Sequence, residues 1–136
     1  MPCKPQAQQR RVMLAGQPTR LTLHVCTADA ITWGLAFADV ADPARMAEVL
    51  QLLVDTAGAN VSATAPQVLP LAVRGATPNP SSQWVTYQGR LPDGRSVQMQ
   101  VAVFARGLRA FQATVVGGEL PAEMVQNFMG SIRFAD

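Results

Sequence analysis

The sequence has few of the residues that carry metal or redox chemistry, since its 136 residues include one histidine and two cysteines. A structural zinc site needs four nitrogen or sulfur ligands, usually in closely spaced pairs. His24, Cys3 and Cys26 are too few and too far apart along the chain to supply such a set. A Cys-x-x-Cys redox pair is absent as well. We therefore predict that the protein has no metal site.

The usual elements of phosphate and acid–base chemistry are also missing. The sequence contains no Gly-x-Gly-x-x-Gly motif and no Walker loop. Its acidic residues are scattered, and Asp39 and Asp42 are explained by the start of a helix. A hydrolase centred on His24 is a less favoured alternative, because Cys26 lies two residues away, where strand side chains are about 6–7 Å apart. We predict no enzyme, no catalytic residues and no cofactor.

Long apolar runs and clustered positive charge are both lacking. No run of about 18 apolar residues occurs, so the sequence predicts no membrane-spanning helix. The net charge is +2, and almost all of the cationic side chains are arginines. These arginines are spread along the chain, whereas a phosphate-binding surface needs them gathered on one face. We therefore predict no nucleic-acid partner.

The first ten residues are polar and include Pro2 and Pro5, so they do not resemble a secretory leader. Two interpretations stay open at this point. One is a cytosolic protein that starts at Met1, and the other is an exported protein whose leader or lipid anchor lies upstream.

The clearest positive feature is the alternation of apolar and polar side chains over residues 95–116. The apolar positions are Val97, Met99, Val101 and Val103, and then, after Gly107, Phe111, Ala113 and Val115. This period of two predicts antiparallel strands with one buried face. Ala102 and Phe104 lie on the otherwise polar side, which indicates that the second face is partly covered too.

The N-terminal part predicts a hairpin around Gly16-Gln17-Pro18, followed by a strand over Ile31–Asp39. In the second arm of the hairpin, the alternation predicts two sides. Leu21, Leu23 and Val25 are expected to point inward, and Thr22, His24 and Cys26 outward.

Two helices are predicted, and the first begins at Asp42-Pro43, a typical capping pair. Its apolar stripe is Met46, Val49, Leu50, Leu53, Val54 and Ala57, and Gly58 is expected to end it. A shorter helix follows over about residues 121–129. Together these elements predict a single α+β domain over residues 1–136. It has a mostly antiparallel sheet of five to seven strands, with one main helix on each side.

The two cysteines are expected to form a disulfide. Cys3 lies in a polar, extended arm, and Cys26 ends a strand beside which that arm can run. The bond would close a loop of about 24 residues and stabilise the fold by about 3 kcal/mol. Such a bond predicts an oxidising compartment. Two unrelated buried thiols remain the alternative.

A long loop over residues 74–83 is rich in Pro, Ser and Asn, and loops of this length often bind partners. Trp84 follows the loop, and Arg90 lies on the same strand. With Arg74, these residues are our candidates for partner binding, since aromatic and arginine side chains dominate binding interfaces. An ordinary loop beside a partly buried tryptophan is the alternative.

Two segments resemble a known family. The ending Phe128-Met129-Gly130-Ser131-Ile132-Arg133-Phe134 and the strand over residues 109–116 are similar to small exported bacterial domains with the PsbP-like fold. The order of predicted elements agrees over nearly the whole chain, although residues 1–5 match no motif of the family. The resemblance implies an α/β/α sandwich with a central antiparallel sheet. It also implies export to the periplasm, often as a lipoprotein, and a binding or accessory role without catalytic residues.

We therefore predict a non-enzymatic periplasmic accessory or binding protein of the cell envelope, either a monomer or a weak dimer. Its expected partner is another envelope protein or a small apolar ligand. The main alternative is a cytosolic chaperone for secreted effectors, whose sheet face receives apolar helices of its client. Free thiols would favour the chaperone, and a Cys3–Cys26 disulfide would favour export.

Overall fold

The computed structural model describes residues 3–14, 16–62 and 64–132, and the described residues form one sheet and two α-helices. The strands are β1 (Gln6–Leu14), β2 (Gln17–Ala28), β3 (Ile31–Asp39), β4 (Thr64–Leu69), β5 (Gln83–Arg90), β6 (Ser96–Arg106) and β7 (Arg109–Gly117). The helices are α1 (Met46–Asn60), α2 (Ala122–Ser131) and a 3-10 turn, η1 (Pro43–Arg45).

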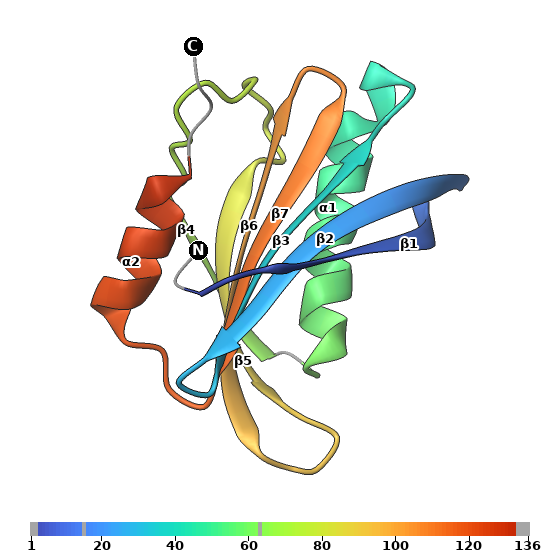
Figure 1. Cartoon of the computed structure of the whole chain (residues 1–136). Coiled ribbons are helices and arrows are strands. Elements are labelled where there is room, and N and C mark those ends of the chain that lie inside the picture. Colours follow the sequence, from blue (N-terminus) through green and yellow to red (C-terminus); the bar gives the residue numbers. More distant parts are fainter. Residues whose placement is uncertain (1–2, 15, 63, 133–136) are drawn as a thin grey trace.

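The seven strands are ordered β1-β2-β3-β7-β6-β5-β4, and all neighbours are antiparallel. Helices α1 and α2 lie on opposite sides of this sheet (Figure 1). The predicted mixed α+β architecture, with its antiparallel sheet and two helices, is therefore confirmed. Arg133 and Phe134, which carry part of the family resemblance, lie outside the described residues.

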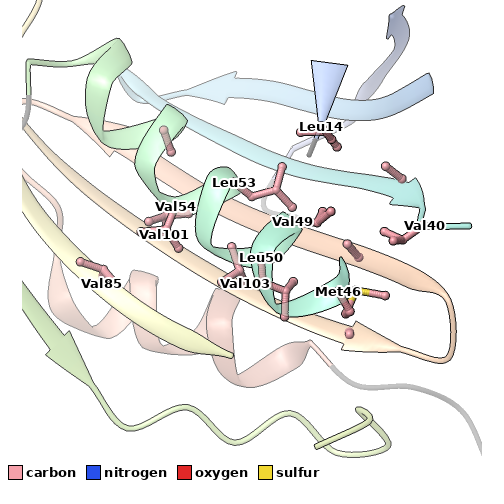
Figure 2. Close-up of a cluster of buried hydrophobic side chains, with 14 of the residues drawn as sticks. Leu14, Val40, Met46, Val49, Leu50, Leu53, Val54, Val85, Val101 and Val103 are labelled. Carbon is pink, nitrogen blue, oxygen red and sulfur yellow. The ribbon is translucent and has the colours of Figure 1, made fainter. Parts of the chain in front are cut away.

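Helix α1 covers one face of the sheet with its predicted apolar stripe. The six stripe residues are all buried: Met46, Val49, Leu50, Leu53, Val54 and Ala57. They pack on β6, where Val101 and Val103 have no exposed surface (Figure 2). We call this cluster the first core. Burial of this stripe holds α1 on the sheet.

The start of this helical region follows the predicted capping chemistry. Asp42 Oδ1 accepts a hydrogen bond from the Ala44 backbone N–H at 3.0 Å, and Pro43 occupies the first helical position. The capped segment is the 3-10 turn η1, and α1 follows it directly. At its other end, α1 continues past Gly58 to Asn60, so the glycine does not end the helix as expected.

Helix α2 covers part of the opposite face and forms the second core. Its buried residues are Val125, Phe128 and Met129. The Phe128 ring meets the buried Trp33 edge-on, with 5.1 Å between the ring centroids. The cross-strand pair Ala102 and Ala113 lies in the same cluster. Both side chains are small, and the large Trp33 and Phe128 side chains fill the space between this part of the sheet and α2.

The register of β6 and β7 corrects the expectation that the apolar series of these two strands share one buried face. Directly opposed residues of an antiparallel pair point to the same side of the sheet. Val103 of β6 is opposed by Gln112 of β7, while Phe104 is opposed by Phe111. The apolar series of the two strands therefore face opposite sides. The reason is the tight turn, which pairs Arg106 with Arg109 and so sets odd positions of β6 against even positions of β7.

Candidate ligand-binding site

The predicted disulfide between Cys3 and Cys26 is present, with 5.8 Å between the two Cα atoms. Cys26 does not point outward as expected: it is 7% exposed and lies in the second core. It opposes Trp33 on the neighbouring strand, on the side that α2 covers. The expectation was wrong because it assumed that this face was open to solvent. The bond ties the N-terminal arm to β2 at the edge of the second core.

His24 does not form a nucleophilic pair with Cys26, because the Cys26 sulfur is bonded to Cys3. A cysteine nucleophile acts as its thiolate. The His24 imidazole instead stacks beside the Phe37 ring, with 6.2 Å between the centroids. A Cys–His pair therefore does not exist while this disulfide is intact, and the hydrolase centred on His24 stays an untested alternative.

The three residues predicted for partner binding do not form one cluster. Trp84 is half-buried, packs against the second core and donates from Nε1 to Gln100 Oε1 at 2.8 Å. Arg90 is exposed six residues further along β5, about 20 Å away at the usual rise of a strand. Arg74 lies on the exposed part of the preceding loop. A binding role for these residues stays a prediction.

The long loop is held against the sheet. Thr77 forms an isolated bridge with Ala105, and its Oγ1 accepts a hydrogen bond from the Gly107 backbone N–H at 2.9 Å. Part of the loop lies over Phe104, which is 1% exposed. The loop therefore acts as a cover for the aromatic side chain beneath it.

A pocket of about 580 Å³ lies between the tip of the β1–β2 hairpin and the start of α1. It forms because β2 and β3 diverge. Their pairing ends at Leu21 and Ala38, beyond which β2 continues to pair with β1. The end of β3 instead stays beside β7, where the Val40 backbone N–H donates to the Leu108 carbonyl at 2.7 Å. Residues from both of these strands line the pocket. The β1–β2 hairpin can be seen to diverge from the end of β3 in Figure 1.

The floor of the pocket is apolar. The buried residues in its lining are Leu14, Ala38, Val40 and Val49. Figure 2 shows Leu14, Val40 and Val49 at the same end of the first core. The volume lies in the range of about 300–1,000 Å³ that is typical of small-molecule sites, which are mostly apolar with a few polar groups.

The rim of the pocket is polar and carries both charges: its ionisable residues are Arg20, Arg45, Arg109, Asp39 and Asp42. Arg109 Nε donates to Asp39 Oδ1 at 2.9 Å, and its guanidinium carbon lies 4.7 Å from the centre of the Phe37 ring. The hydrogen bond from Asp39, together with its charge, raises the pKa of Arg109. The Asp42 carboxylate caps η1.

A row of aromatic side chains crosses the second face beside the pocket. Phe37 and Phe111 have centroids 6.0 Å apart, and Phe111 and Phe104 stack nearly parallel at 5.3 Å. Phe37 and Phe111 are half-buried, so this end of the second face is only partly covered. Phe37 also lines the pocket, which links the row to it.

Sequence reasoning missed this pocket because it depends on which strands are neighbours. Asp39 and Arg109 lie at the ends of predicted strands, and they meet only because β3 pairs with β7. The length of the β1–β2 hairpin is a weaker indication of the pocket. A hairpin that extends beyond the neighbouring strand leaves an open space beside its end.

The chain matches no protein-family model, and no curated protein sequence is significantly similar to it. Among the described residues, neither helix is long and apolar enough to cross a membrane. In the same part of the chain, His, Cys, Asp and Glu side chains do not gather in threes or more that could hold a metal ion.

Proposed function

We propose that this protein is a non-catalytic binding protein of an oxidising compartment, the periplasm, and that the pocket beside the β1–β2 hairpin is its ligand site. Of the two predicted partners, a small ligand with apolar character fits this proposal better than another envelope protein. The resemblance to PsbP-like domains adds the expectation of an accessory role in the cell envelope.

The observation that carries the proposal is the apolar floor at the end of the first core. Val40 and Val49 line a concave space, although α1 and the sheet bury the rest of their cluster against each other. A small apolar molecule bound there would extend the first core and bury its own apolar surface against these buried side chains.

The disulfide supports the compartment and weighs against the alternative of a cytosolic chaperone. Disulfides persist in oxidising compartments and are rare in the cytosol. The test is to trap thiols with an alkylating reagent in intact source cells before extraction. The proposal expects Cys3 and Cys26 to be unalkylated in the main population, whereas two alkylated cysteines would favour the chaperone.

Binding is tested with N-phenyl-1-naphthylamine, a neutral apolar dye whose fluorescence increases when it leaves water. We expect saturable binding to the wild-type protein. Two variants should weaken binding: Val40→Phe fills the floor, and Ala41→Trp blocks the exposed mouth with little risk to folding.

The matched control is Val68→Trp, which adds an exposed aromatic side chain on edge strand β4, at the opposite end of the strand order. This variant should bind the dye as the wild type does. A lack of saturable binding, or equal binding by all variants, would overturn the proposal.

A further inference from the structure

We infer that the pocket takes an anionic amphiphile, a molecule with one apolar chain and one terminal anionic group such as a carboxylate. This inference rests on the proposed function and specifies the ligand of the same site. The apolar chain would lie on the floor formed by Val40 and Val49, and the anionic group would lie at the rim near Arg20.

The first argument is the charge of the rim. It carries three arginines and two aspartates, which leaves one excess positive charge. Both carboxylates already have partners: Asp39 accepts from Arg109, and Asp42 caps η1. A ligand with a negative group is therefore favoured over one with a positive group at this rim.

The second argument is the position of Arg20 on the hairpin. Arg20 is directly opposed by Arg11 of β1, so the two side chains lie on the same side of the sheet. Like charges in this arrangement repel each other. An anion placed at Arg20 reduces this repulsion and accepts charge-assisted hydrogen bonds from the guanidinium.

The third argument is the position of the charges relative to the apolar floor. The buried lining residues are all apolar, and the rim arginines are all exposed. A ligand can therefore bury its chain while its charged group stays near water, which avoids the high cost of burying an ion. A fully apolar ligand would gain no charge-assisted hydrogen bond from Arg20.

The test compares decanoate, 1-decanol and decylammonium, which share a chain and differ in charge. The two ions are used below the concentrations at which they form micelles, and 1-decanol is used below its solubility limit. Their affinities are measured by calorimetry and by displacement of the neutral dye. We expect decanoate to bind about tenfold more tightly than decanol, an energy typical of one charge-assisted hydrogen bond. Decylammonium should bind more weakly than decanol, and added salt should weaken decanoate binding alone.

The decisive variant is Arg20→Glu, with Arg20→Gln as a neutral companion. Arg20→Glu should remove the preference, so that decanoate no longer binds more tightly than decanol. It should also fold, because the new carboxylate opposes Arg11. The control is Arg90→Glu, which makes the same change of charge at an exposed site on β5 and should keep the preference.

Two failures are distinguishable. If decanol and the neutral dye bind but decanoate has no advantage, or if Arg90→Glu acts like Arg20→Glu, this inference is overturned and the binding function stands. If neither the dye nor any of the three amphiphiles binds, the proposed function fails as well.

Discussion

At the scale of single residues, the disulfide has the clearest energetic role. Cys26 is buried beside Trp33, and its bond to Cys3 fixes the N-terminal arm to the second core. The sequence predicted this pair because a cysteine in a polar arm has little reason to be there without a partner. It did not predict the burial of Cys26, which depends on α2 covering that face.

Replacing both cysteines with alanine is expected to lower the free energy of unfolding by about 3 kcal/mol, because the unfolded chain loses the constraint of a closed loop. Urea unfolding of the double variant Cys3→Ala/Cys26→Ala measures the difference. Wild-type protein under reducing conditions serves as a control and should shift in the same direction. A loss of less than about 1 kcal/mol would contradict the role given to this bond.

Tyr87 is the single tyrosine of the chain, so its titration can be followed without interference. Partial burial, and secondly the charge of Asp55, raise the pKa of Tyr87 above its ordinary value of 10.0. We expect Asp55→Asn to lower this pKa, as measured by the ultraviolet absorbance of the phenolate. Asp93→Asn, on the turn between β5 and β6, is the control and should leave it unchanged.

The same shift predicts a dependence of stability on alkaline pH. The folded protein holds the Tyr87 proton more tightly than the unfolded chain does. Its contribution to stability is therefore present below pH 10 and is lost as the pH rises through the folded pKa. Asp55→Asn should reduce this loss in urea unfolding between neutral and alkaline pH, and an unchanged profile would contradict the assignment.

At the scale of elements, α1 is the part that sequence reasoning predicted best. Its cap and its apolar stripe are local features, because the residues that form them all lie between Asp42 and Ala57. The faces of β6 and β7 were harder to predict, because each strand alternates clearly by itself. Only the register of the turn, which opposes Val103 with Gln112, shows that the two apolar series face opposite sides.

Leu50 tests the packing of α1, since its side chain is fully buried in the first core. We expect Leu50→Ala to lower the free energy of unfolding by about 2–5 kcal/mol, through lost burial and a residual cavity. Thr56→Ala, at an exposed position of the same helix, should change it by less than about 0.5 kcal/mol. Equal effects of the two variants in urea unfolding would contradict the assigned orientation of α1.

At the scale of the whole molecule, a helix packs on each side of the sheet, and a pocket lies between the β1–β2 hairpin and the start of α1. The divergence of β2 from β3 beyond Leu21 and Ala38 creates the pocket, and this divergence depends on long-range pairing. The sequence therefore predicted the layers of the fold but not the site. Residues such as Val40 and Arg20 had no local pattern that linked them.

The account depends on the pocket being a binding site, and two-dimensional amide NMR during a titration with decanoate tests this most directly. We expect saturable shifts that cluster on the pocket lining, at Thr19, Arg20, Val40, Ala41 and Arg45. Amides of α2 and of edge strand β4 should be unchanged. Shifts that do not saturate, or that concentrate on α2 or β4, would contradict the account.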